Sequence, residues 1–137
     1  MRRPLYILIL ERDPSIRECY RSVLAPFGAR VQFDLCSNSE KWKVRLAERQ
    51  LSSASACPTL LLTDSDIDVL TYIKESPKWG LLPVVMVSST PESCLPEAYD
   101  KSVSALVPCP EDPSEREDIL ARLVRFWLAS TIPNTGG

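Results

Sequence analysis

Residues 6–14, with the sequence YILILERDP, decide how this chain is expected to fold. The aliphatic run from Tyr6 to Leu10 is typical of a strand that is buried on both faces of a parallel sheet. Asp13 and Pro14 then form a helix start, because aspartate is a favoured N-cap and proline is tolerated at the first helical position. Gly28 is expected to end that helix. Between these two signals, apolar residues recur at helical spacing, at Ile16, Cys19, Tyr20, Val23, Leu24 and Phe27.

The same alternation of strand and helix patterns continues along the chain. Further strands are predicted at 31–35, 59–63, 84–87 and 104–107, and further helices at 39–50, 68–76, 90–102 and from Asp112 through Trp127. Pro96 should shorten or kink the helix at 90–102. Five strands that alternate with five helices predict an α/β fold, in which a parallel sheet has right-handed crossovers and helices on both faces. The domain is expected to span 1–130, with 131–137 a disordered tail or the start of a linker.

Composition excludes several classes of function. The chain has 137 residues and a net charge of -2, so it lacks the basic surface that a nucleic-acid partner requires. It has no histidine, which removes Ser-His and Cys-His catalysis and histidine metal ligands. No apolar run reaches the roughly 20 residues needed to span a bilayer, so we expect a cytoplasmic protein without a membrane segment.

The five cysteines indicate neither disulfides nor zinc. They are scattered without a CxxC pair, and most should be core or half-buried residues. A redox role for Cys109 is disfavoured, because no residue identifiable from the sequence is placed to lower its pKa. The three tryptophans should mainly pack against the core, although one exposed tryptophan would suit a partner anchor.

Polar residues follow the predicted strands at the edge where parallel sheets gather their functional groups. They are Glu11, Arg12 and Asp13 after the first strand, Asp64 after the third, Ser88 and Ser89 after the fourth, and Cys109 and Pro110 after the fifth. Carboxylates that converge there would bind Mg²⁺, and Asp64 would serve as a phosphoryl acceptor. The alternative is that these residues only terminate strands and cap helices, and the residues themselves leave both readings open.

Four runs of sequence carry a resemblance to a known family. ILILERDPSIR (7–17), PTLLLTD (58–64), LPVVMVSS (82–89) and ALVPCP (105–110) resemble, in order and spacing, the successive signature blocks of response-regulator receiver domains. Together they cover roughly residues 5–130. The resemblance implies the flavodoxin-like (βα)5 fold of two-component signalling proteins.

The resemblance also implies roles for individual residues. Asp64 matches the aspartate that accepts the phosphoryl group from a histidine kinase, and Ser88 matches the hydroxyl residue that contacts that group. Glu11 and Arg12 match the acidic pair that helps to hold Mg²⁺. If any Mg²⁺ is bound, Glu11 and Asp64 are the expected ligands.

Three positions depart from the family pattern. Arg12 replaces a carboxylate with a cation, and Cys109 replaces the lysine of a Lys-Pro pair, of which Pro110 is expected to retain the cis bond. Leu106 stands where the family has its aromatic switch residue. Phosphoryl transfer depends on positioned charge, so the pocket should be degenerate, with Mg²⁺ binding weak or absent. Arg12 is expected either to pair with Asp64 or Asp13 in place of the metal, or to point to solvent.

The leading hypothesis is therefore a pseudo-receiver that is not an enzyme and acts by phosphorylation-independent binding of a protein. The partner would be a signalling kinase or an output protein. The binding face would comprise the fourth helix, the fifth strand and the fifth helix, about 91–128, and would also suit a homodimer. One alternative is a single-domain response regulator that is phosphorylated on Asp64. Another is a flavodoxin-like module that binds a small molecule.

Overall fold

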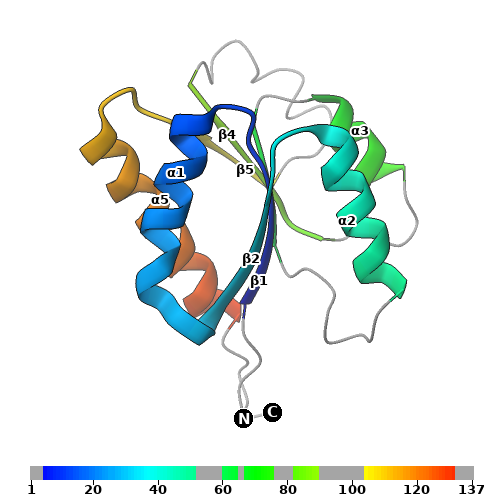
Figure 1. Cartoon of the computed structure of the whole chain (residues 1–137), viewed down its shortest axis with the longest axis horizontal. Coiled ribbons are helices and arrows are strands. Elements are labelled where there is room, and N and C mark those ends of the chain that lie inside the picture. Colours follow the sequence, from blue (N-terminus) through cyan, green and yellow to red (C-terminus); the bar gives the residue numbers. More distant parts are fainter. Residues whose placement is uncertain (1–4, 52–59, 65–66, 76–81, 90–103, 132–137) are drawn as a thin grey trace.

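The computed structural model describes residues 5–51, 60–64, 67–75, 82–89 and 104–131. These form a parallel sheet in the order β2-β1-β3-β4-β5, with helices on both faces (Figure 1). The predicted α/β fold is thus confirmed. The elements are β1 (Leu5–Leu10), α1 (Pro14–Leu24), the 3₁₀ segment η1 (Ala25–Arg30), β2 (Val31–Cys36), α2 (Ser39–Leu51), β3 (Leu60–Thr63), α3 (Ile67–Lys74), β4 (Val84–Ser88), β5 (Ala105–Pro108) and α5 (Pro113–Thr131).

Two hydrophobic layers enclose the sheet. On one face α1 and α5 pack over Leu5, Ile7 and Ile9, and on the other α2 and α3 pack over Tyr6 and Leu8. Successive side chains of a strand point to opposite faces, so β1 supplies both layers in turn. All six β1 residues are at most 4% exposed. This explains why the strand reads as a continuous aliphatic run.

Strand pairing brings the ends of β1 and β3 together. β1 lies between β2 and β3, with Ile9 opposite both Leu35 and Leu62. The chain leaves β1 at Glu11 and leaves β3 at Asp64, which places these two acidic residues at one edge of the sheet. The fold therefore assembles the predicted crevice.

The helix α1 begins as predicted but ends earlier. Asp13 is its N-cap and accepts a hydrogen bond from the backbone N–H of Ser15, with Pro14 in the first turn. The predicted end at Gly28 is wrong. The helix α1 ends at Leu24, and the chain then forms the 3₁₀ segment η1. Pro26 lacks the N–H that another α-helical turn would use. Gly28, with φ of 57°, takes the left-handed conformation that glycine adopts readily.

Two of the tryptophans can be placed. Trp42 is fully buried, and its indole N–H donates to the carbonyl of Leu8 at 3.5 Å, while Trp127 is half-buried against the α1–α5 layer. Trp79, the predicted helix around Pro96 and the tail at 132–137 lie outside the described residues. Among the residues that are described, no helix is both long enough and apolar enough to cross a bilayer.

Thr63 gives a test of the packing of β3. Its hydroxyl is buried and has no hydrogen-bond partner among the described residues. Thr63→Val keeps the side-chain shape and removes the unsatisfied oxygen, so we expect the free energy of unfolding to rise by about 1 kcal/mol. Urea denaturation of both proteins measures this difference. A loss of stability would show that the hydroxyl is hydrogen-bonded in solution.

Candidate functional site

A small crevice lies at the carboxyl ends of the strands. It has a volume of about 260 Å³, and its lining comes from the loop after β1, from α1 and from the ends of β3, β4 and β5. The lining residues are Glu11, Arg12, Asp13, Ile16, Asp64, Val87, Ser89 and Cys109. Five of the eight predicted site residues are therefore brought together, and Ser88, Pro110 and Leu106 are not among the lining residues.

Arg12 and Asp64 form an ion pair across the crevice. The guanidinium Nη1 of Arg12 lies 2.7 Å from Oδ1 of Asp64, and the backbone N–H of Arg12 donates to Oδ2 at 3.1 Å. Both oxygens of the Asp64 carboxylate are thus engaged by one residue. The Arg12 side chain is 47% exposed and that of Asp64 is 14% exposed, so the pair closes the solvent side of the carboxylate. Of the two partners predicted for Arg12, the structure selects Asp64.

The Asp13 carboxylate accepts hydrogen bonds at the start of α1. Its Oδ1 accepts hydrogen bonds from both the backbone N–H and the hydroxyl of Ser15, at 2.9 and 2.8 Å. These bonds hold the pKa of the Asp13 carboxyl below its usual value, with the hydroxyl bond as the largest cause. Asp13 therefore anchors the start of α1 rather than pairing with Arg12.

Glu11 is a buried carboxyl beneath the ion pair. It is 4% exposed, and its Oε2 accepts a hydrogen bond from the backbone N–H of Asp13 at 3.2 Å. Burial raises the pKa of Glu11 to about 7 from an ordinary value of 4.5, and repulsion by Asp64 and Asp13 adds to this. The hydrogen bond from Asp13 and the charge of Arg12 lower the pKa only in part. Near neutral pH, Glu11 is divided between its neutral and charged forms.

Cys109 closes the crevice at the end of β5. Its backbone N–H donates to the carbonyl of Ser88 at 2.8 Å, and its side chain is buried. Burial is the main cause that raises the pKa of the Cys109 thiol above its usual value, so the thiol stays protonated and neutral. The predicted cis bond at Pro110 is wrong, since the described residues contain no cis peptide bond. Cys19, Cys36 and Cys109 are all free thiols, as expected without a disulfide framework.

Ser88 and Leu106 lie beside the crevice. Ser88 is 2% exposed, whereas its neighbour Ser89 is exposed and lines the crevice. The Leu106 side chain is half-buried against the layer that contains α2 and α3. The residue that the sequence resemblance assigns to the switch position is thus an aliphatic side chain that packs against the core.

Two arginines that the sequence did not single out hold the loops of the site. Arg17 donates from Nη1 to the carbonyls of Glu11 and Arg12, at 3.0 and 2.8 Å. Arg116 donates to the carbonyl of Pro110 at 3.1 Å and to that of Glu111 at 3.2 Å. Each sits in the first turns of a helix, where an arginine looks like an ordinary surface residue, so the sequence offered no signal for this role.

The donor groups of the crevice do not converge as a metal centre. Within the described part of the chain, no three His, Cys, Asp or Glu side chains lie close enough together to hold a metal ion. Glu11 and Asp64 both line the crevice, and the guanidinium of Arg12 already binds Asp64.

Comparison with known proteins places this geometry in context. The sequence matches no family model and no curated protein. The phosphorylated cyanobacterial phytochrome response regulator RcpA matches with a TM-score of 0.80 and 21% identity, over 96% of this chain and 99% of that chain. The Mn²⁺-bound response regulator Rcp1 matches with a TM-score of 0.82 and 20% identity, over 95% and 99% of the two chains. A response-regulator receiver domain from Rhodospirillum rubrum matches with a TM-score of 0.79 and 18% identity, over 94% and 97%.

The chain has the receiver fold. These similarities extend over almost the whole of both chains, and the strand order is that of the flavodoxin-like sheet predicted from the sequence. The crevice described above lies at the strand edge where such sheets carry their functional groups.

The raised pKa of Glu11 predicts a pH dependence of stability. The folded protein binds the Glu11 proton more tightly than the unfolded chain, so this stabilisation is complete below pH 4.5 and is lost as the pH rises through about 7. The loss should total about 3 kcal/mol. Glu11→Gln retains an oxygen acceptor for the Asp13 N–H and should remove this dependence, making the variant more stable than the wild type at pH 8.

Guanidinium denaturation at several values between pH 5 and pH 8 measures the difference. Glu18→Gln is the matched control, because Glu18 is an exposed carboxyl on α1 and should leave the wild-type profile unchanged. Identical profiles for Glu11→Gln and the wild type would contradict the assignment.

Proposed function

We propose that this chain is a receiver-type signalling module that acts by binding a protein partner and does not depend on phosphorylation. The observation that carries the proposal is the ion pair between Arg12 and Asp64. An internal cation occupies the carboxylate that a metal and a phosphoryl group would both require in a conventional receiver.

The electrostatics of the crevice support this proposal. Mg²⁺ prefers several oxygen ligands, and at this site Asp64 would have to exchange its guanidinium partner for the metal. The fixed charge of Arg12 would then lie next to the incoming dication. Both effects oppose metal binding, so Mg²⁺ binding should be weak or absent.

The position that matches the family lysine carries no charge in this chain. Cys109 offers a neutral, buried thiol, which is a weak donor. Arg12 is paired with Asp64 itself, and Arg17 and Arg116 each direct the guanidinium to backbone carbonyls of the loops. A phosphoryl group on Asp64 would therefore lack the lysine charge, and with Mg²⁺ disfavoured it would also lack the metal, that phosphoryl transfer uses in a conventional receiver.

The surface of α5 offers a contact for a partner. Ile119, Leu123 and Phe126 follow one another at helical spacing and lie on one side of the helix. Phe126 is 62% exposed, and its ring packs edge-to-face against Trp127 with centroids 5.6 Å apart. An exposed aromatic ring held by a second ring is a suitable anchor for a protein interface. This patch belongs to the face predicted at 91–128, of which the structure describes 104–128.

The second candidate is a response regulator that is phosphorylated on Asp64. The position of Asp64 at the end of β3, in a crevice shared with Glu11, favours it. RcpA is described as phosphorylated and Rcp1 as Mn²⁺-bound, so the fold itself is compatible with this chemistry. The two candidates differ in whether a metal ion can displace the Arg12 guanidinium from Asp64.

Replacement of Arg12 separates them. The wild type should show no saturable amide shifts in NMR spectra with millimolar Mg²⁺ or with beryllofluoride, which mimics the phosphoryl group. Arg12→Asp restores an acidic pair with Glu11 and should bind Mg²⁺ with at least roughly tenfold higher affinity. Arg12→Ala is the control that removes the cation without adding a ligand. Saturable shifts around Asp64 in the wild type, spreading to β5 and α5, would establish the phosphorylation mechanism instead.

Partner binding should be independent of Asp64 but sensitive to Phe126. A partner retained by the wild-type protein should also be retained by Asp64→Asn, while Phe126→Asp should weaken binding by roughly tenfold or more. Val44→Asp is the matched control, because Val44 is exposed on α2, away from α5. Quantitative binding assays with these four proteins make the comparison. Loss of binding in Asp64→Asn would contradict the proposed mechanism.

A further inference from the structure

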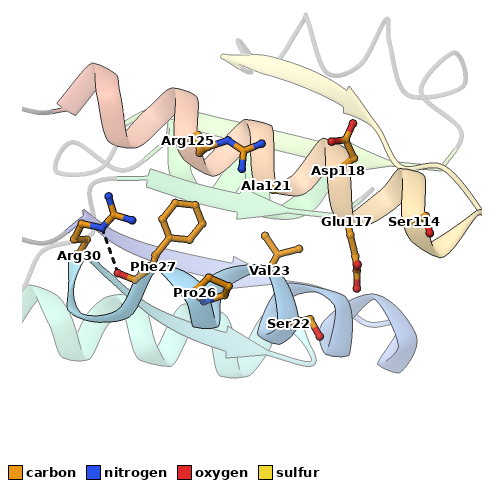
Figure 2. A pocket seen from close by; sticks show the side chains of 10 residues that line it. All are labelled: Ser22, Val23, Pro26, Phe27, Arg30, Ser114, Glu117, Asp118, Ala121 and Arg125. Atoms are coloured by element: carbon orange, nitrogen blue, oxygen red, sulfur yellow. Dashed lines mark hydrogen bonds between the residues drawn. The ribbon is translucent and has the colours of Figure 1, made fainter.

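The helices α1 and α5 lie on the same face of the sheet (Figure 1), and a groove runs between them (Figure 2). Its volume is about 530 Å³. Residues of α1 and η1 form one wall and residues of α5 form the other. The lining comprises Ser22, Val23, Pro26, Phe27, Arg30, Ser114, Glu117, Asp118, Ala121 and Arg125.

The two ends of the groove carry opposite charge. Figure 2 shows Arg30 and Arg125 at the end that holds the Phe27 ring, and Glu117 and Asp118 toward the other end. The Arg30 guanidinium lies 5.4 Å from the Phe27 ring centroid, so the cationic end is also aromatic. Asp118 pairs with Arg122 at 3.0 Å, but the described ion pairs of the chain include neither Glu117 nor Arg30 nor Arg125.

On α5, an acidic and a basic residue lie at equal distances on either side of Ala121. Glu117 and Arg125 are each four positions from Ala121, and all three line the groove. Glu117 and Arg125 are separated by eight residues, or about 12 Å along the helix axis, which is too far for them to pair with each other. Ala121 has a small side chain, which allows a second helix to approach closely at the midpoint.

We infer that two copies of this chain associate through this groove, with their α5 helices antiparallel around a two-fold axis at Ala121. A two-fold axis brings the same patch of each copy together, so a surface that uses it must be self-complementary. In an antiparallel pair centred on Ala121, Glu117 of each copy faces Arg125 of the other. The acidic end of one groove thereby meets the cationic end of the second.

The apolar lining supplies the rest of the contact. Pro26 is exposed and Phe27 is partly exposed on the η1 side of the groove, and both would be covered by the second copy, while Val23 beside them already belongs to the core. Exposed ion pairs are worth less than about 1 kcal/mol each, so the dimer should be weak and should weaken further with salt. The inferred interface is distinct from the Phe126 patch, and it stands whether or not the proposed function holds.

A charge exchange on the full chain tests this inference by sedimentation velocity over a series of submillimolar concentrations. Arg125→Glu and Glu117→Arg each place like charges opposite one another, and each should raise the dimer dissociation constant by roughly tenfold or more. The double variant Glu117→Arg/Arg125→Glu reverses both partners and should restore the dissociation constant to within about threefold of the wild-type value. Lys41→Glu on α2 is the matched control for a change of sign and should leave it unchanged.

Recovery in the double variant is the decisive result, because a merely destabilised fold would not be rescued by a second substitution. Circular dichroism checks that each variant is folded. A wild-type protein that stays monomeric throughout the concentration series would overturn the inference. So would dimers that persist in both single variants, since they would have to use another face.

Discussion

The burial of β1 on both faces is the constraint on which the rest of the structure depends. This strand pairs with β2 on one side and β3 on the other, and its side chains alternate between the α1–α5 layer and the α2–α3 layer. An interior position in the sheet buries six consecutive apolar residues on both faces and pairs their backbone groups at once. Because β1 pairs with β3, the residues that follow β1, Glu11 and Arg12, line the same crevice as Asp64, which follows β3.

The ion pair between Arg12 and Asp64 matters mainly because it occupies the Asp64 carboxylate, and less because it stabilises the fold. Arg12 is nearly half exposed, so the pair contributes on the order of 1 kcal/mol or less to stability. Its geometry nevertheless engages both oxygens of Asp64, using the side chain and the backbone of one residue. The fold presents a carboxylate at the end of β3, and in this chain an internal salt bridge occupies it. Glu11, which lines the same crevice and is partly neutral near pH 7, is the carboxyl with the most strongly raised pKa in the described part of the chain.

Most of the fold could be predicted from the sequence, because strands buried on both faces leave continuous aliphatic runs and Asp-Pro pairs mark helix starts. The end of α1 could not, since Pro26 and Gly28 are both helix breakers and the apolar pattern continues to Phe27, which packs against the core from the 3₁₀ segment. At the site, the sequence could name Arg12, but only the structure could choose between its two acidic neighbours, because Asp13 is taken up by Ser15. Ser88 and Ser89 are adjacent and chemically alike, and which of them lines the crevice depends on the local direction of β4 as it ends. The roles of Arg17 and Arg116 could not be predicted, because their partners are backbone carbonyls, which have no sequence signature.

Two different sides of α5 offer two separate contact surfaces. Glu117, Ala121 and Arg125 share a stripe that lines the groove with α1, whereas Phe126 is the next residue along the helix and projects about 100° away. A second copy seated in the groove would therefore leave the Phe126 ring accessible to a different protein. In a conventional receiver, the crevice and the α5 surface are linked by rearrangement of a switch residue. Leu106, the residue that the sequence resemblance assigns to that position, is packed into the opposite layer, and Asp64 is held by Arg12. Under the proposed function, signals would be carried by which surfaces of α5 are occupied, and the crevice would be a fixed part of the scaffold.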